Sequence, residues 1–319
     1  MAKKKKRESD MIDLIDFQIS FCEGKKEDNG EDSEKHVLTE RSALIGVFDG
    51  CGGAGARVYE NLSNKTGAYI ASRAVADAFE DWFEEGSGSQ EKLVEKLTEY
   101  LRICESLSGA KDQLIGMISK KLPTTAAAAV LTAGTQVVDT DLYWAGDSRL
   151  YLLDQDGLAQ LTEDDLGGID AFDNLSEDGV LTNMINLSTD FSIHHGRYTV
   201  RRPSIVFAAT DGCFGYLPSP MAFEYLLLST LMNSRSVEEW EQTLVHEIGE
   251  IAGDDYSISG ISMGFGSLDN LKKTLMPRMD YVYRTYIEGS EEKDRDRLLE
   301  EWQTYRTSYH RALIRGVQA

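Results

Sequence analysis

The stretch that decides the fold is "VFDGCGG", residues 47–53. Asp49 follows a short apolar run, and four small residues follow Asp49. An aspartate in such a place either ends a buried strand and holds a metal ion or forms an ordinary Asp-Gly turn. For one Asp-Gly pair alone the turn is the more common case, so the other strand ends of the chain have to decide between the two.

The composition limits the classes of function that are open to the chain. With 319 residues, 41% of them hydrophobic, it can form one large domain or two. The formal net charge of −21 argues against nucleic-acid binding. No apolar run approaches the roughly 20 residues that span a bilayer, and none follows the basic start "MAKKKKRESD". We therefore expect a cytoplasmic protein without a nucleic-acid or membrane partner, and a disordered basic tail over residues 1–11.

Cysteine and histidine spacing argues against a zinc site. The four cysteines show no C-x-x-C pair, and the five histidines form no H-E-x-x-H motif. Free thiols are typical of a reducing compartment. A bound metal should therefore be a hard cation on oxygen ligands, Mg²⁺ or Mn²⁺.

Apolar periodicity predicts an α+β fold, because helices come in pairs and strands come in runs. The acidic stretch 163–179 is predicted to be a loop or mobile flap, and residues 23–35 are predicted to be a polar loop. Strands are predicted over 12–22, 44–48, a β-meander over 125–162, 204–210 and 256–265, and helices over 68–83, 93–118 and 237–251.

A helical extension is predicted over residues 267–319, interrupted near Pro277, with a further helix starting at Ser290. Its last part carries a stripe of apolar residues on one face. The stripe either caps the chain's own domain or forms a surface for a partner or for self-association through residues 290–315. The stripe consists of Leu298, Trp302, Tyr305, Tyr309 and Leu313.

Acidic residues recur where predicted strands end. Carboxylates gathered at one edge of a sheet would repel one another and raise one another's pKa values, and divalent cations would remove that cost. This repetition favours the metal-bearing interpretation of Asp49 over the turn. The acids are Glu31 and Asp32 after the first strand, Asp49, Asp147 in a turn between two strands, Asp211, and Asp254 with Asp255 before the last strand.

Four stretches, in order, resemble the motifs of the type 2C metal-dependent Ser/Thr protein phosphatases, the PPM family. They are "VFDGCGG", "AGDSRLYLLDQDGLAQLTEDD", "FAATDG" and "GDDYSISGISMGF". They correspond to the family patterns VFDGHGG, GDSR…G…LTxDH, xSDGxxD and an acidic pair before the last strand. "NGEDS", residues 29–33, resembles an early N-E-D motif. The resemblance covers residues 12–266, which are predicted to form the phosphatase-like domain.

The resemblance implies a four-layer αββα sandwich, two antiparallel sheets flanked by helix pairs, with two Mn²⁺ or Mg²⁺ ions at one end. It further implies hydrolysis of phosphoserine and phosphothreonine on proteins by a water that bridges the metals, without a phosphoenzyme. The residue roles that it implies are Asp49 as the bridging ligand, Gly50 through its carbonyl and Glu31 on one metal with Asp32 beside it, Asp211 and Asp254 on the other, and Asp147 on a weaker third ion.

Three departures from the family pattern leave an alternative open. Cys51 stands where the family has a histidine proposed as general acid, and Gly215 stands where a further aspartate is expected. No arginine lies between Met11 and Glu40 to bind phosphate. The alternative is a catalytically weak pseudophosphatase that binds phosphoproteins and regulates a partner. Cys51 and Cys213 each follow a metal-site Asp-Gly pair, which allows a redox pair as well as simple packing.

Overall fold

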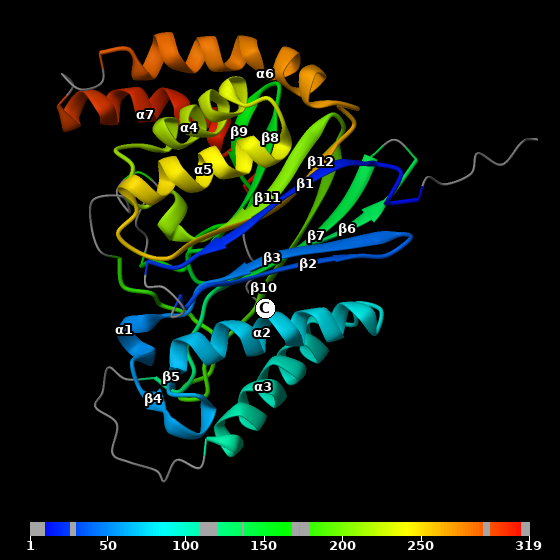
Figure 1. Ribbon diagram of the computed structural model, residues 1–319, viewed down its shortest axis with the longest axis vertical. Coiled ribbons are helices and arrows are strands. Elements are labelled where there is room, and N and C mark those ends of the chain that lie inside the picture. Colours follow the sequence, from blue (N-terminus) through cyan, green and yellow to red (C-terminus); the bar gives the residue numbers. More distant parts are fainter. Residues whose placement is uncertain are drawn as a thin grey trace, which may run out of the picture.

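Two antiparallel five-stranded sheets face each other at the centre of the protein, and helices cover both outer faces (Figure 1). The computed structural model describes residues 10–25, 30–108, 120–135, 137–167, 172, 179–289 and 294–313. The two facing sheets and their covering helices confirm the predicted α+β sandwich.

The first sheet has the strand order β1-β12-β11-β8-β9, and all its neighbouring strands are antiparallel. Alternating or continuous apolar residues in these strands bury one or both faces, which favours extended structure. The strands are β1 (Ile15–Glu23), β8 (Arg149–Asp154), β9 (Gly157–Gln160), β11 (Ser204–Ala209) and β12 (Tyr256–Met263).

The second sheet has the order β10-β7-β6-β3-β2, again antiparallel throughout. A separate two-stranded ribbon, β4 (Val58–Tyr59) with β5 (Lys65–Thr66), precedes the first long helix. The strands of the second sheet are β2 (Ser33–Leu38), β3 (Ser42–Phe48), β6 (Ala126–Ala133), β7 (Val137–Ala145) and β10 (His194–Arg201).

Helices α2 and α3 cover the second sheet, and α4 to α7 lie over the first (Figure 1). Four of these helices begin after serine or aspartate caps whose side chains accept a backbone N–H three residues on. The helices are α1 (Gly52–Gly55), α2 (Gly67–Glu84), α3 (Gln90–Leu107), α4 (Pro220–Asn233), α5 (Val237–Ile251), α6 (Leu268–Val282), continued by a π-helical turn (Tyr283–Ile287), and α7 (Arg295–Tyr309).

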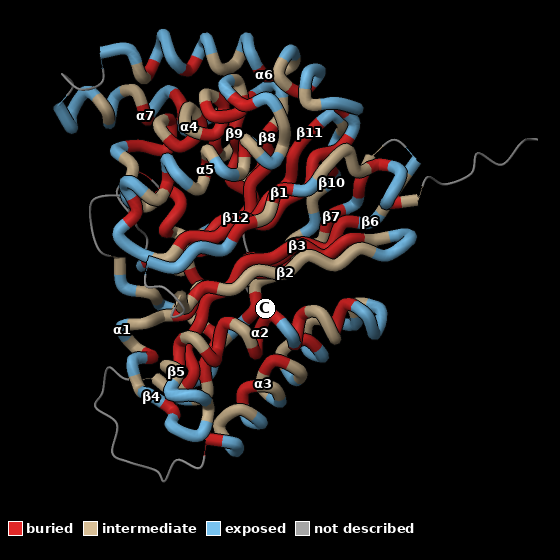
Figure 2. Tube along the Cα trace, in the orientation of Figure 1, coloured by how far each residue is buried: buried red, intermediate tan, exposed pale blue. Residues whose placement is uncertain are grey.

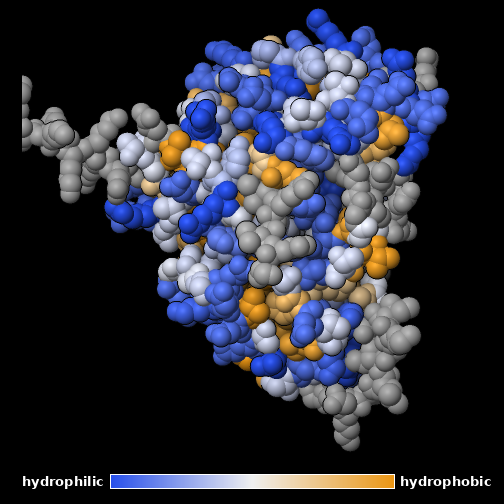
Figure 3. Space-filling view, turned by 180° about the vertical axis from the view of Figure 1, so that it is seen from behind, coloured by the Kyte–Doolittle hydropathy of each residue, from blue (hydrophilic) through white to orange (hydrophobic). Residues whose placement is uncertain are grey.

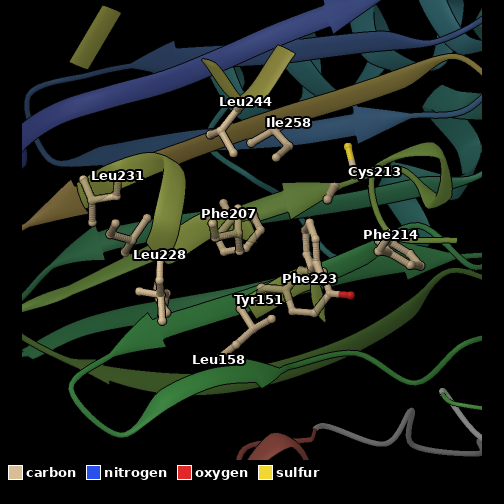
Figure 4. Close-up of a cluster of buried hydrophobic side chains, with 14 of the residues drawn as sticks. Tyr151, Leu158, Phe207, Cys213, Phe214, Phe223, Leu228, Leu231, Leu244 and Ile258 are labelled. Atoms are coloured by element: carbon tan, nitrogen blue, oxygen red, sulfur yellow. The ribbon is translucent and has the colours of Figure 1, made fainter. Parts of the chain in front are cut away.

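Buried residues form three layers, one between the sheets and one under each group of helices (Figure 2). Under α4 to α7 the layer is rich in aromatic rings: Tyr151 stacks on Phe207 with ring centroids 5.1 Å apart and meets Phe214 edge-on at 6.0 Å (Figure 4). Seen from behind, the described surface is mostly hydrophilic, with separate hydrophobic patches (Figure 3). No helix among the described residues is long and apolar enough to cross a membrane.

The structure differs from the sequence-based predictions in several elements. Residues 33–35 were predicted to lie in a polar loop but form the first half of the edge strand β2, whose Lys35 pairs with Asp77 and Glu80 of α2 at 2.9 and 2.6 Å. Helix α4 was not predicted, because its apolar residues run all around it and show no single face. Helix α6 continues through Pro277. Of the predicted helix over 93–118, residues 109–118 lie outside the described part of the chain.

The C-terminal helices pack into the same core as the outer helices of the sandwich. Glu224 of α4 is fully buried and accepts hydrogen bonds from Arg278 of α6, at 2.7 and 2.8 Å, and from the Tyr305 hydroxyl of α7, at 2.6 Å. Trp302, Tyr305 and Tyr309 are almost fully buried. The apolar stripe thus caps the chain's own domain. A partner surface over 290–315 remains a prediction and would have to use the other faces of α7.

At the other end, the packed chain begins slightly earlier than predicted. Met11 is fully buried, and its backbone N–H donates to the Glu40 carbonyl at 2.7 Å. The basic tail therefore ends before Met11, because this residue fills part of the core between the sheets. Residues 1–9 lie outside the described part of the chain.

Candidate metal centre

The sheet register explains why acids from distant parts of the sequence meet. In the first sheet, Ala209 at the end of β11 pairs with Arg149 at the start of β8 and with Ile258 near the start of β12. The turn before β8, the segment after β11 and the segment before β12 therefore lie at one edge. These segments carry Asp147, Asp211 and Asp254.

Asp49 reaches the same edge from the second sheet. It follows β3, whose last residues pair with the start of β6, and the Asp49 carbonyl accepts the Thr125 backbone N–H at 2.8 Å and the Thr124 hydroxyl at 2.7 Å. Burial raises the pKa of the Asp49 carboxyl well above its usual range, and the neighbouring charges raise it further. These charges are those of Asp211, Asp32, Asp147 and Asp254.

Asp32 is the most enclosed carboxylate of the group. Its Oδ2 accepts the hydroxyls of Thr210 and Ser257, each at 2.9 Å. Burial raises the pKa of Asp32 to about 7 against these two hydrogen bonds, helped by the charges of Asp211 and Asp255. Asp32 is therefore held inside the protein by hydroxyl groups, behind the open part of the site.

Glu31 points the other way, toward the small residues after Asp49. The Thr66 hydroxyl donates to Glu31 Oε1. A Cβ on Gly52 would collide with Glu31 Oε2, so a side chain at this position would displace the Glu31 carboxylate. Gly50 forms an isolated bridge with Thr124, which places its backbone beside Asp49.

The acidic pair before β12 divides into two environments. Asp255 is tied to the backbone, because its Oδ1 accepts the Lys25 N–H at 2.7 Å and its Oδ2 accepts the Glu31 N–H at 2.5 Å. Asp254 is exposed, and its charge contributes, after burial, to the raised pKa of Asp211, which is about 6. Asp254 is thus the accessible member of the pair, and Asp255 joins the N-terminal segment to the centre.

Asp147 has an unsatisfied buried atom. Its Oδ1 is inaccessible and has no hydrogen-bond partner, and burial followed by the charge of Asp211 raises its pKa well above the usual range. Arg149, two residues later, opposes this effect. Asp164 Oδ2 accepts a hydrogen bond from Arg149 Nη2 at 2.6 Å, so the acidic stretch predicted to be a flap is tied to the core near its start. Most of residues 168–178 lie outside the described part of the chain.

The donor chemistry of this cluster fits a hard divalent cation. All its side-chain donors are carboxylate oxygens, which suit Mg²⁺ or Mn²⁺, and their raised pKa values mean that a cation would relieve mutual repulsion. Within the described residues, no three acidic, histidine or cysteine side chains are close enough to form a complete ligand set in this arrangement. The acids therefore converge without closing around a metal position.

The departures from the family pattern also have structural counterparts. Burial raises the pKa of the Cys51 thiol well above its usual range, with Asp49, Asp147 and Asp211 adding to the effect. Cys51 is therefore a neutral thiol at physiological pH. All four cysteines are free, and the Cys213 thiol donates to the Ser257 carbonyl at 3.3 Å, which favours packing over a redox pair.

A pocket of about 370 Å³ opens beside the acids. It joins Glu31 and Asp254 to a small set of basic and aromatic residues. The Lys65 ammonium lies 4.3 Å from the centre of the Tyr69 ring, close enough for a cation–π contact. Besides these residues, the lining consists of Lys25, Asn64, Thr66, Gly253 and Asp255.

The sequence of residues 25–248 matches the family model of protein phosphatase 2C. The chain belongs to this family. It is accordingly classed as a protein-serine/threonine phosphatase. A search of curated protein sequences found no match.

Solved structures share the fold of this phosphatase at low sequence identity. The serine/threonine phosphatase PstP/Ppp of Mycobacterium tuberculosis has a TM-score of 0.55 and 17% identity, covering 77% of this chain and 98% of its own. The S. agalactiae serine/threonine phosphatase gives 0.55 and 17%, covering 78% and 99%. Stp1 of Staphylococcus aureus gives 0.56 and 15%, covering 77% and 94%. All three were solved as bacterial serine/threonine phosphatases, and at these identities they show a common fold.

Sequence reasoning missed several residues that shape this site. Thr210 and Ser257 hold Asp32, and the sequence carries only a weak signal of this role in the position of Thr210 next to Asp211. Lys65 lies in the short ribbon β4–β5, which has no motif of its own. Arg149 belongs to the quoted "GDSR" motif, but its buried contacts depend on segments far away in the sequence.

Proposed function

We propose that the chain hydrolyses phosphoserine and phosphothreonine on proteins with the help of two Mn²⁺ or Mg²⁺ ions, and that it does so in the cytoplasm. The observation that carries the proposal is the convergence of Asp49, Asp147 and Asp211 at one edge of the sandwich, where each carboxyl has a raised pKa because of burial and of its acidic neighbours. Bringing buried acids together destabilises the protein, and a bound divalent cation would offset the repulsion between them.

The residues proposed to hold the ions are those whose carboxylates border the accessible part of the centre. Asp49 would bridge the two ions, with Glu31 and the Gly50 carbonyl on one and Asp211 and Asp254 on the other. Bound divalent cations lower the pKa of water and neutralise charge on phosphoryl oxygens. A third ion would use the buried, unpartnered Oδ1 of Asp147, without help from position 215, where glycine has no side chain.

The chain's own residues would position the substrate. Lys65 and Lys25 line the pocket beside Glu31 and Asp254, where their charges attract a phosphate dianion to an otherwise acidic edge. Lys65 would supply a point charge in place of the two-pronged contact that an arginine makes. The Cys51 thiol is a poor proton donor compared with histidine, so the leaving group would depend on solvent for its proton.

A pseudophosphatase that binds phosphoproteins and regulates a partner is the second candidate. It is supported by the neutral thiol of Cys51 and by Gly215, which remove a proton donor and a metal ligand. This candidate predicts metal and phosphoprotein binding with little or no turnover.

The proposal is tested by hydrolysis of p-nitrophenyl phosphate and of a phosphothreonine peptide, each with Mn²⁺ and with EDTA. We expect Mn²⁺-dependent turnover of both substrates, abolished in Asp49→Asn and Asp211→Asn. Asp139→Asn is the matched control, since Asp139 is exposed on β7 away from the cluster and its loss should leave turnover unchanged. Tight Mn²⁺ binding without turnover favours the pseudophosphatase, and absence of Mn²⁺ binding contradicts both candidates.

A further inference from the structure

Arg149 is a buried cation directly behind the proposed metal centre. Its side chain is 1% exposed. The Asp164 carboxylate accepts hydrogen bonds from Arg149 Nε at 3.0 Å and from Nη2 at 2.6 Å. The pair has no net charge, and it holds the Nε and Nη2 edge of the guanidinium group. The remaining nitrogen, Nη1, has to find its partners elsewhere, because an unpaired buried N–H of a charged group is costly.

Two tyrosine hydroxyls serve this remaining nitrogen. Arg149 Nη1 donates to Tyr151 Oη at 3.3 Å and to Tyr309 Oη at 3.4 Å, and the two hydroxyls lie 3.2 Å from each other. Tyr151 is a neighbour on β8, but Tyr309 comes from the last turn of α7, 160 residues away. Helix α7 lies beyond residues 25–248, the part of the chain that matches the family model.

The flat face of the guanidinium supports the segment that carries Asp211. The Arg149 guanidinium carbon lies 4.2 Å from the centre of the Phe214 ring, a cation–π contact. Phe214 follows a short 3₁₀ turn, Asp211–Cys213, and its backbone N–H donates to the Asp211 carbonyl at 3.0 Å. Phe214 also meets Tyr151 edge-on (Figure 4). A shift of Arg149 would therefore be transmitted to the Asp211 backbone.

Helix α7 is anchored independently of this contact. Tyr305, one turn before Tyr309, donates to the buried Glu224, and Arg311 donates to Asp154 and to the Gly157 carbonyl at 2.8 and 2.7 Å. The position of the Tyr309 hydroxyl is therefore set by several contacts besides Arg149. A fixed hydroxyl can hold a mobile side chain in place, which is what a positioning residue has to do.

We propose that Tyr309 is a positioning residue, through which the C-terminal helix α7 holds Arg149 and Phe214 and so fixes the Asp211 segment of the metal centre. Its value for metal binding rests on the function proposed above, but the structural coupling does not. The two tyrosines of α7 offer a matched comparison: Tyr309→Phe removes the hydroxyl on Arg149, and Tyr305→Phe removes an equally buried hydroxyl on Glu224.

The deciding experiment measures backbone amide hydrogen exchange in the full chain with EDTA, by mass spectrometry, for both variants and the wild type. We expect Tyr309→Phe to speed exchange over residues 211–217 about 3- to 10-fold, the range of one lost hydrogen bond of ordinary strength, and to leave α2 unchanged. Tyr305→Phe should leave residues 211–217 within about twofold of the wild type. Equal exchange of this segment in the two variants would overturn the proposal.

Mn²⁺ titration by calorimetry adds the functional readout. We expect the Mn²⁺ dissociation constant to rise about 3- to 10-fold in Tyr309→Phe and to stay near the wild-type value in Tyr305→Phe, even where Tyr305→Phe unfolds at a lower temperature. An unchanged constant in Tyr309→Phe would overturn the role of Tyr309 at the metal centre. If the wild type binds no Mn²⁺, the proposed function fails, while hydrogen exchange still decides whether α7 fixes the Asp211 segment.

Discussion

Asp49 and Asp211 follow strands of opposite sheets, and among the charges around Asp49 that of Asp211 contributes most, after burial, to its raised pKa. The two sheets of the sandwich therefore interact through the charges of these two carboxyls as well as through their apolar faces. In the metal-free protein this contact is repulsive whenever both carboxyls are ionised.

Metal-free stability should fall as the pH rises. The folded state raises the pKa of Asp32 from 3.8 to about 7 and that of Asp211 from 3.8 to about 6, so between these values the folded chain binds more protons than the unfolded chain. The free energy of unfolding therefore decreases from about pH 4 to about pH 7. We expect the melting temperature in EDTA to be more than about 5 °C lower at pH 7.5 than at pH 5. Saturating Mn²⁺ should remove or reverse this difference, and a melting temperature that rises with pH in EDTA would contradict it.

Asp211→Asn should stabilise the metal-free protein while abolishing Mn²⁺ binding. The amide removes a buried charge that is repelled by Asp254, so we expect a gain of about 1–3 kcal/mol in the free energy of unfolding at pH 7.5. Urea unfolding in EDTA measures this gain, with Asp139→Asn as the control that should change it little. A destabilised Asp211→Asn would mean that the carboxylate has favourable partners in the folded chain that outweigh repulsion.

Cys51→His should favour substrates with poor leaving groups. The neutral thiol of Cys51 donates a proton poorly, whereas a histidine at the same position can act as a general acid. We expect kcat for a phosphothreonine peptide to rise about 10- to 100-fold, and kcat for p-nitrophenyl phosphate to change little, because its phenolate leaves without help. Cys51→Ser serves as the size-matched control. Equal gains on both substrates would argue against a general-acid role.

Lys65→Ala should weaken substrate binding without affecting the metal. Lys65 lines the pocket next to Glu31 but lies on the ribbon β4–β5, outside the acidic cluster. Losing one charge contact to phosphate should raise KM for a phosphopeptide about 10-fold, equivalent to about 1.4 kcal/mol. The Mn²⁺ dissociation constant should stay the same. Lys92→Ala, on the exposed face of α3, is the control. A KM unchanged in Lys65→Ala would place the phosphate elsewhere.

Glu224→Ala should destabilise the protein strongly. Removing this fully buried carboxylate leaves Arg278, the Tyr305 hydroxyl and the Leu158 backbone N–H without their acceptor. Breaking a buried ion pair on one side costs about 3–5 kcal/mol. Denaturant unfolding measures the loss, and Arg197→Ala is the control, because Arg197 forms an exposed pair with Asp141 that should contribute less than about 1 kcal/mol. Similar losses in both variants would contradict a special role for the buried pair.

The sequence by itself determined the fold class and the family of this protein, and it named the acids proposed to form its site. Apolar runs that end in acids are local patterns; they predicted an α+β fold and a carboxylate cluster, and their resemblance to the family motifs implied the sandwich and the roles of Asp49 and Asp211. The apolar periodicity of α2 and α5 is also a local pattern, and it was enough to predict these two helices. Where periodicity was absent, as in the uniformly apolar α4, or masked by polar residues, as in β2, the prediction failed.

Only the tertiary structure decided what each acid faces and what lies behind the centre. The sequence alone does not show which of the neighbours Asp254 and Asp255 faces solvent. In the structure β12 pairs with β1, Asp255 accepts hydrogen bonds from the backbone of Lys25 and Glu31, and Asp254 is exposed. In the same way, nothing near Tyr309 in the sequence indicates Arg149. Burial and electrostatic environment depend on contacts between residues far apart in the chain, and these contacts exist only after the sheets and helices have packed.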